Sequence, residues 1–331
     1  MREVTLIPGD GIGPEVAAIC KDAAARLKVD IRFDEQPAGL PAERAGQGRL
    51  PEKVLESIRR TKLAFKGPLA ADGASKKPSP NVELRKALNL FANIRPIRLL
   101  PGIQGPFSKV DFVVIRENTE DIYSGIEHEV SEGVVETVKI VTENASRRVA
   151  AFAFDWARRH DRRKVTAIHK ANIMKMSDGL FLSCAKEEAA KNTDIEFSDL
   201  IVDAAAMNLV RRPQQFDVVL CGNLYGDLLS DLGAGLVGGA GVCFGINRGP
   251  DTIVYEVFHG AQEELAGKRT FNPIAALLAS GRLFRQAGSP EACARLETAV
   301  SLVTAEKKVR TADLGGNDST DKFLEAVYAK L

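Results

Sequence analysis

The sequence of 331 residues predicts an α/β fold. Short apolar runs typical of buried strands, such as Val4–Ile7 and Val218–Leu220, alternate with longer segments that have helical periodicity. Proline or serine stands at the predicted start of several helices, as at Pro14 and Ser79. Strands that alternate with helices along the whole chain are typical of a largely parallel sheet covered by helices.

The composition excludes several classes of function. With 45% hydrophobic residues, 27% charged residues and a net charge of +1, the chain has no overall attraction for nucleic acid or an anionic membrane. No apolar run approaches the ~20 residues of a transmembrane helix. Met1 leads almost at once into a strand, and the five cysteines form no C-x-x-C motif. We therefore expect a cytoplasmic protein with reduced thiols, no targeting peptide, and no nucleic-acid or membrane partner.

The first strand leads into a glycine-rich turn, PGDGIGP. Pro14 stands where a dinucleotide-binding G-x-G-x-x-G motif has its third glycine, so a simple Rossmann site is not predicted. The next elements are a strand, a helix, a strand and a polar loop: Ile31–Phe33, Pro51–Arg60, Leu63–Phe65 and Ala71–Pro78. Ser79 then caps a helix that carries Asn81 and Arg85 on one face, which is either plain capping or a receptor for a carboxylate or phosphate.

Two further arginines occupy strand positions. Arg95 lies in the run ANIRP, and Arg116 follows the strand Asp111–Ile115. A buried guanidinium needs an anionic partner, because leaving it desolvated and unpaired is costly. Either ordinary ion pairs or a polyanionic substrate satisfies this requirement.

The middle of the chain contains a predicted arm and two further strand ends. Glu117–Gly125 reads as a loop that contains Tyr123, and Gly133–Thr142 alternates like an exposed strand that could pair with a second subunit. Lys170 follows the strand Val165–His169, and Asp203 follows Ile195–Val202. A strand-end lysine is a candidate base, although a structural ion pair is the commoner role.

A candidate metal site follows the strand Val218–Leu220. Asp227 and Asp231 are four residues apart, so a helix places both carboxylates on one face. No cationic residue stands at helical spacing to neutralise them, and nearby glycines indicate close packing rather than an open surface. Two carboxylates repel each other unless a cation lies between them, and Asp203 could complete an oxygen-rich shell for Mg²⁺ or Mn²⁺. The alternative is a solvated helix face.

Several segments taken together closely resemble the decarboxylating β-hydroxyacid dehydrogenases, which act on isocitrate, homoisocitrate or 3-isopropylmalate. The landmarks of the resemblance, which covers almost the whole chain, are LIPGDGIGPE (6–15), NIRP (93–96), RENTE (116–120), HKAN (169–172) and the segment of Asp227 and Asp231. It implies an α/β, non-Rossmann fold with a mixed central sheet and two lobes. The large cofactor-binding lobe would comprise 1–95 and 248–331. The small lobe would comprise 96–247, with a dimer-forming arm at about 126–143.

The resemblance also implies a homodimer whose active sites are shared between subunits. Arg85, Arg95 and Arg116 would hold substrate carboxylates. Asp227 and Asp231 would bind the metal together with Asp203 of the neighbouring subunit. Tyr123 and the neighbour's Lys170 would form the acid/base pair. The residues implied in cofactor binding are His259, Gly260, Glu264, Asn272, Asp313 and Asn172.

Within the family, the helix at Ser79 favours isocitrate. Ser79 and Asn81 resemble the isocitrate pattern, in which a hydroxyl and an amide bind a third carboxylate, whereas isopropylmalate enzymes have an apolar pocket here. Homoisocitrate is the first alternative, then 3-isopropylmalate. An alternative of another class is a non-catalytic regulatory subunit of a hetero-oligomeric isocitrate dehydrogenase. Glu264 stands where NADP-specific relatives carry a lysine, so NAD is expected, because an acid accepts ribose hydroxyls and repels a 2′-phosphate.

Overall fold

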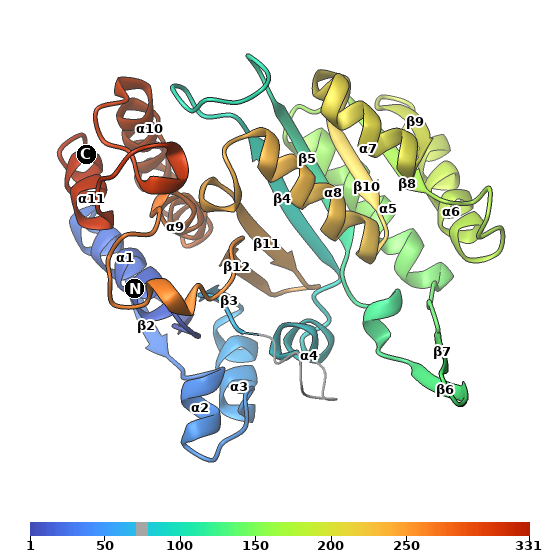
Figure 1. The fold of residues 1–331 in the computed structure, drawn as a ribbon, viewed down its shortest axis with the longest axis horizontal. Coiled ribbons are helices and arrows are strands. Elements are labelled where there is room, and N and C mark those ends of the chain that lie inside the picture. Colours follow the sequence, from blue (N-terminus) through green and yellow to red (C-terminus); the bar gives the residue numbers. More distant parts are fainter. Residues whose placement is uncertain (71–78) are drawn as a thin grey trace. The chain divides into compact units, whose positions relative to one another are not determined.

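The structure is a computed structural model that describes residues 1–70 and 79–331, so the predicted loop Ala71–Pro78 lies outside the described residues. The chain, drawn in Figure 1 with colours that follow the sequence, forms two compact units. Unit 1 comprises residues 1–88, 99–108 and 234–331, and unit 2 comprises residues 89–98 and 109–233. Unit 2 begins and ends earlier than the predicted small lobe. Its first strand carries Arg95 and pairs with a strand of the same unit, which explains the earlier start.

Unit 1 contains five strands in the order β2-β1-β3-β12-β11. Their bounds are Arg2–Ile7 (β1), Ile31–Glu35 (β2), Leu63–Lys66 (β3), Phe244–Arg248 (β11) and Ile253–Val257 (β12). Neighbouring strands are parallel except β11, which runs antiparallel to β12. The sequence did not predict β11.

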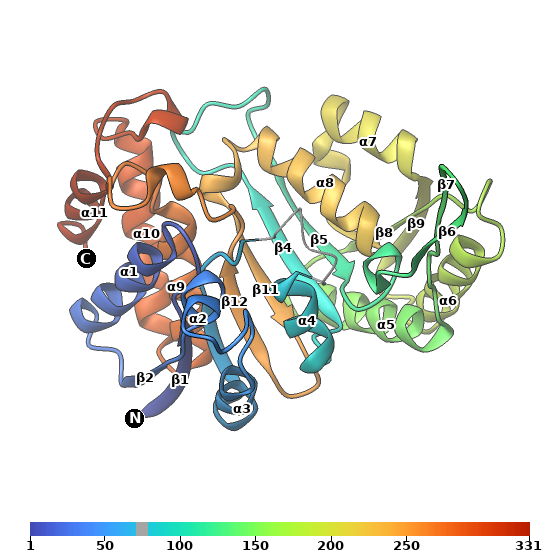
Figure 2. The ribbon, with the colours of Figure 1, turned by 60° about the horizontal axis from the view of Figure 1, so that its bottom comes forward.

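Helices cover the strands of unit 1. They are Gly13–Arg26 (α1), Leu40–Arg44 (α2), Glu52–Thr61 (α3), Pro80–Ala87 (α4), Ile274–Gln286 (α9), Pro290–Glu306 (α10) and Thr320–Tyr328 (α11). The central helix is α9, whose residues 274–281 are all buried. It packs against β3, β11, β12 and α1, and it lies beside α10 (Figure 2).

Unit 2 contains the strands β4-β5-β10-β8-β9 in that order. Their bounds are Ala92–Arg98 (β4), Asp111–Glu117 (β5), Lys164–His169 (β8), Glu196–Ile201 (β9) and Val218–Cys221 (β10). Only β4 and β5 pair antiparallel. The helices Glu143–Arg159 (α5) and Ser177–Lys191 (α6) cover one face of these strands, and Val202–Arg211 (α7) and Asn223–Leu236 (α8) lie on the other (Figures 1 and 2). Parallel pairing brings the carboxyl ends of β5, β10, β8 and β9 to one edge.

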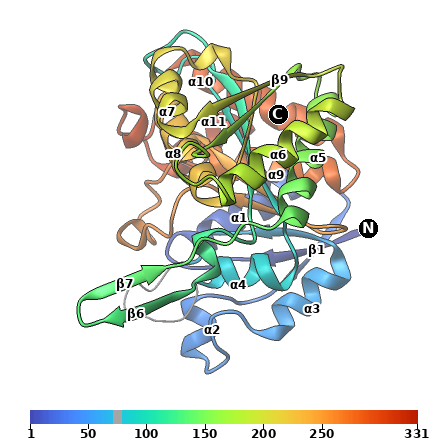
Figure 3. The same cartoon turned by 90° about the vertical axis from the view of Figure 1, so that its right-hand side faces the viewer.

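A two-stranded hairpin extends from unit 2, away from α5 and α6 of the same unit (Figure 3). It consists of Glu127–Ser131 (β6) and Val134–Thr137 (β7), and it falls within the predicted arm. The second strand is shorter than the predicted Gly133–Thr142, because the chain leaves the hairpin and Ile140 bridges to Asp121. Its apolar residues are exposed, with Val135 at 65%.

Within residues 1–70 and 79–331, no helix combines the length and apolar character needed to cross a bilayer. The five cysteines are all buried and none forms a disulfide.

Candidate active site

The candidate site is built around α8. The strand β10 is buried along its whole length, and the chain turns at Gly222 to begin α8 at Asn223. The helix packs tightly on the strands beneath it, because a Cβ at Gly226 would lie 2.5 Å from Cγ of Arg116. One face of α8 therefore presents Asn223, Asp227 and Ser230, at intervals of four and three residues, to the strands.

Two arginines from neighbouring strands converge on Asp227. Arg95 donates to Oδ1 of Asp227 at 3.0 Å, and Arg116 donates to the same oxygen. Strand register explains the convergence: Asn93 lies opposite Arg116, so Arg95, two residues further along β4, projects from the same face. Both guanidiniums are further fixed, because Arg116 donates to Asn223 at 2.8 Å and Arg95 donates to Ser230 at 2.6 Å.

Tyr123 reaches the same carboxylate from a short 3₁₀ turn, Ile122–Ser124. Its hydroxyl donates to Oδ2 of Asp227 at 2.6 Å, and the Arg116 guanidinium lies 5.1 Å from its ring centre. Asp121 holds the turn: its carboxylate accepts from the N–H groups of Ile122 and Leu224, at 2.9 and 3.0 Å. A phenol, two guanidiniums and a carboxylate thus meet at one point.

The expectation of two unpaired carboxylates on one helix face is wrong for Asp227. Helical spacing does not reveal Arg95 and Arg116, because both come from strands distant in sequence. Asp231, one turn later, has no hydrogen bond or ion pair with any described residue. Burial and the charge of Asp227 raise the pKa of Asp231, while Arg95 and Arg116 oppose that rise. Asp231 is therefore the carboxylate that lacks a direct counter-charge.

The third predicted metal ligand, Asp203, does not join this pair within the chain. It lies in the first turn of α7 and is 68% exposed. Accordingly, no three His, Cys, Asp or Glu side chains gather as a metal-binding group in the part of the chain that the structure describes.

Lys170 and Asp203 do lie together. The parallel strands β8 and β9 place His169 opposite Ile201, so the residues that follow each strand emerge side by side. Nζ of Lys170 donates to Oδ1 of Asp203 at 2.5 Å, and this hydrogen bond lowers the pKa of Asp203. Asn172 lies in the exposed turn that follows Lys170.

The residues that favour isocitrate belong to unit 1. Ser79 caps α4 as predicted, accepting from the N–H of Val82 at 3.4 Å, and Asn81 donates to the carbonyl of Leu69 at 3.1 Å. Arg85 lies on the same helix, 3.7 Å from Glu256 of β12. Glu256 also contacts Lys66 at 3.2 Å, and burial lowers the pKa of this lysine.

Of the predicted cofactor residues, His259 and Asn272 are buried in unit 1, and Asp313 is exposed. Asn272 donates to Oδ2 of Asp313 at 2.9 Å, and its own Oδ1 caps α9 through the N–H of Ile274. His259 donates from Nδ1 to the carbonyl of Gly260 at 3.1 Å. Its buried Nε2 has no hydrogen-bond partner among residues 1–70 and 79–331, and burial lowers its pKa. Glu264, in contrast, is exposed on a 3₁₀ turn, Glu263–Leu265.

Sequence reasoning missed several side chains that hold the arginines: Asn93, Asn223, Ser230 and Glu256. A signal existed for Asn223 and Ser230, because they share the helical face of Asp227. None existed for Glu256, because its partner Arg85 lies more than 170 residues earlier and their contact depends on the pairing of β12 with β3.

This geometry agrees with the comparison with known families. Residues 3–327 match the family described as isocitrate/isopropylmalate dehydrogenase. The chain belongs to this family. The resemblance stated from the sequence and the predicted fold class are therefore confirmed.

Individual members of the isocitrate/isopropylmalate dehydrogenase family are similar over most of their length. A probable mitochondrial isocitrate dehydrogenase [NAD] subunit alpha of Caenorhabditis elegans is 44% identical, over all of this chain and 92% of the relative. A mitochondrial isocitrate dehydrogenase [NAD] catalytic subunit 5 of Arabidopsis thaliana is 45% identical, over 98% of this chain and 87% of the relative. The crystal structure of isocitrate dehydrogenase from Methylococcus capsulatus has a TM-score of 0.96 and 42% identity, over 100% of this chain and 99% of that one.

The expected cytoplasmic location is contradicted by these relatives, since the worm and plant proteins are both mitochondrial. The expectation rested partly on reduced cysteines. Buried thiols without disulfide partners fit any reducing compartment, so they do not distinguish the cytoplasm from an organelle.

Proposed function

We propose that this member of the family catalyses the NAD-dependent oxidative decarboxylation of isocitrate to 2-oxoglutarate, CO₂ and NADH. The observation that carries the proposal is the convergence of Arg95, Arg116 and the Tyr123 hydroxyl on Asp227. Two fixed guanidiniums beside a phenol suit a polycarboxylate that must receive a proton. The relatives named as NAD isocitrate dehydrogenase subunits support the same activity.

The choice of isocitrate within the family rests on α4. Ser79 accepts a hydrogen bond from the N–H of Val82, so its own hydroxyl hydrogen is available to a substrate carboxylate. Asn81 uses one amide hydrogen on Leu69 and has a second to donate. A hydrogen-bonding site rejects an apolar substituent much more strongly than an apolar pocket rejects one extra methylene, so isopropylmalate should be a poor substrate.

Two side chains are each assigned one proton transfer, Lys170 in the first step of the reaction and Tyr123 in the last. The neighbour's Lys170 would take the proton of the substrate hydroxyl, and a bound nicotinamide would supply the hydride acceptor for the same carbon. The carboxylate on the adjacent carbon then leaves as CO₂, and its bonding electrons pass into the enolate of the new ketone. Tyr123 donates its proton to the carbon left behind, and Arg95 and Arg116 hold the remaining carboxylates in place.

A divalent cation fits the donor set. Asp227 and Asp231 offer only oxygen, the ligand that Mg²⁺ and Mn²⁺ prefer, and burial raises the pKa of Asp231, so a bound cation would favour its charged form. The exposed Asp203 of a second copy would supply the third carboxylate. Such an ion would polarise the substrate hydroxyl and stabilise negative charge on the same oxygen.

The cofactor proposed is NAD. Asn272 and Asp313 form a fixed polar pair, and the buried Nε2 of His259 remains available to a ligand among the described residues. The exposed Glu264 would accept ribose hydroxyls and repel a 2′-phosphate.

The assembly proposed is a homodimer with shared active sites. The exposed valines of the β6–β7 hairpin are suited to pairing with a second copy. The worm and plant relatives are named as subunits, so pairing with a different chain is the alternative outcome.

Steady-state kinetics of the purified chain tests the function. We expect kcat/KM with isocitrate, Mg²⁺ or Mn²⁺ and NAD to exceed that with homoisocitrate and 3-isopropylmalate. A preference for either alternative substrate would move the assignment to that enzyme. Absence of turnover by the chain alone, with activity restored by another subunit, would identify a regulatory subunit.

A further inference from the structure

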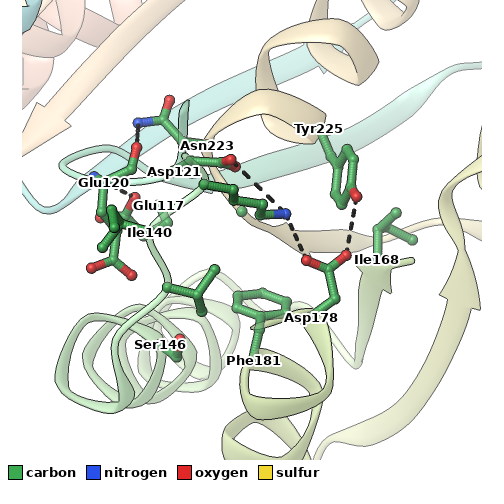
Figure 4. A pocket seen from close by; sticks show the side chains of 13 residues that line it. Glu117, Glu120, Asp121, Ile140, Ser146, Ile168, Asp178, Phe181, Asn223 and Tyr225 are labelled. Carbon is green, nitrogen blue, oxygen red and sulfur yellow. Dashed lines mark hydrogen bonds and ion pairs between the residues drawn. The ribbon is translucent and has the colours of Figure 1, made fainter. Parts of the chain in front are cut away.

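Asp178 is a buried carboxylate that the proposed chemistry does not use. It lies in the first turn of α6, its side chain is 4% exposed, and it lines a small cavity of about 20 Å³ in unit 2 (Figure 4). That volume has room for about one water molecule, so the cavity is no substrate pocket. We infer that Asp178 is the positioning residue for Lys170. This inference rests on the proposed function in one respect, the assignment of Lys170 as the base.

Both oxygens of Asp178 accept hydrogen bonds. Oδ2 accepts from the backbone N–H of Lys170 at 2.6 Å and from the Tyr225 hydroxyl at 3.0 Å. Oδ1 accepts from Nζ of Lys139 at 2.6 Å. Burial and Asp178 together raise the pKa of Tyr225, so the phenol keeps its proton and continues to donate. A carboxylate bound by three donors, one of them a cation, is held in a single orientation.

The bond to the Lys170 N–H determines where that side chain points. Lys170 follows β8 directly, and the seven residues from Lys170 to Met176 form an irregular turn before α6. The carbonyl of Lys170 accepts from the N–H groups of Ile173 and Met174, at 3.0 and 2.9 Å. Asp178 restrains the same residue on its N–H side. Because Cβ is fixed relative to the backbone, losing that restraint lets Nζ move away from its place beside Asp203.

Lys139 extends the network to the segment of Tyr123. Its Nζ lies 3.9 Å from Oδ1 of Asp121, the residue that caps the 3₁₀ turn carrying Tyr123, and 4.6 Å from the ring centre of Tyr225. The half-buried Lys139 therefore joins two segments of one chain, the one that carries Tyr123 and the one that carries Lys170, and Asp178 is its closer partner.

The test compares Asp178→Ala and Asp178→Asn with wild type, with Asp194→Asn as the matched control. Asp194 is an acid of the same unit that pairs with Arg158 and makes no hydrogen bond or ion pair with the described residues of the Lys170 turn. Hydrogen exchange, followed by mass spectrometry on peptides covering 169–177, measures the restraint directly. We expect Asp178→Ala to speed exchange there and to lower kcat about 10- to 100-fold, the usual cost of misplacing a reacting group by about 1 Å. KM for isocitrate and the affinity for Mn²⁺ should change less than about threefold.

Asp178→Asn keeps an acceptor for the Lys170 N–H but loses the charge opposite Lys139, so its effects should lie between those of wild type and alanine. In a Lys170→Met background, Asp178→Ala should leave the residual turnover unchanged within about twofold, because its effect passes through Lys170. A further fall in that background, or unaltered exchange in Asp178→Ala, overturns the inference. If wild type does not oxidise isocitrate, the proposed function fails, while the exchange measurement still decides the role of Asp178.

Discussion

Arg116, at the end of β5, binds Asp227, which lies 111 residues later on α8. The contact exists because Gly226 has no side chain, so the helix can lie directly on the arginine. The contact between Asp227, a candidate metal ligand, and Arg116, a candidate substrate-binding residue, therefore depends on the close packing that Gly226 allows. Each prediction below tests one part of this arrangement or of the chemistry proposed for it.

Gly226→Ala should destabilise the protein and displace Arg116. An added methyl group would lie 2.5 Å from Cγ of Arg116, and such overpacking costs about 1–3 kcal/mol, more than alanine gains by its helix propensity. Gly235→Ala on the same helix is the control, because nothing lies within 4 Å of its added Cβ. Urea unfolding of both variants measures the difference. Equal stabilities would show that α8 does not pack on Arg116 as described.

Lys170→Met should nearly abolish turnover and leave Mn²⁺ binding measurable, because it removes the proposed base without removing a carboxylate. Lys175→Met, in the same exposed turn, is the control and should retain activity. Activity assays and calorimetric titration with Mn²⁺ check the two properties. Substantial turnover by Lys170→Met would exclude Lys170 as the base.

Asp231→Asn should remove most of the thermal stabilisation that Mn²⁺ gives the wild type. A ligand present at 100 times its Kd stabilises the folded state by about 2.7 kcal/mol, which is readily seen as a rise in Tm. Without metal, the variant should be no less stable than wild type, because burial disfavours the charged form of Asp231. The same Mn²⁺-dependent rise in Tm for both proteins would place the metal elsewhere.

Glu264→Lys should raise kcat/KM for NADP relative to NAD, because it replaces repulsion of the 2′-phosphate with attraction. Glu263→Gln, its exposed neighbour in the same turn, is the control. Parallel assays with both cofactors measure the ratio. If wild type already uses NADP as well as NAD, Glu264 has no discriminating role.

His259 should make stability depend on pH below its ordinary pKa of 6.5. Burial lowers the pKa of the folded state, so between the two pKa values the unfolded chain binds more protons than the folded protein. The free energy of unfolding therefore rises with pH in this window, by at most about 1.4 kcal/mol per pH unit, and is lost as the pH falls. Urea midpoints between pH 5 and 7.5 should show a shallower slope for His259→Asn than for wild type. Equal slopes would contradict this account.

The spacing of residues in short stretches of sequence was sufficient to predict several features of the site. The interval between Asp227 and Asp231 places them one helical turn apart in any α-helix, and Ser79 before Pro80 predicts a cap that the structure contains. The order of strands and helices, with the landmark segments, was sufficient for the family. These features depend only on the local geometry of a few consecutive residues, and this geometry can be inferred from the sequence alone.

Only the tertiary structure determines which charged side chains contact one another. Arg95 and Arg116 reach Asp227 because β4 and β5 pair with Asn93 opposite Arg116, and Lys170 reaches Asp203 because β8 and β9 pair with His169 opposite Ile201. The contacts of Asp178 arise in the same way, from segments that fold onto one another. Register between distant strands is fixed by the packing of the whole unit rather than by any short stretch of sequence. For that reason, the expectation of unpaired carboxylates on α8 failed at Asp227.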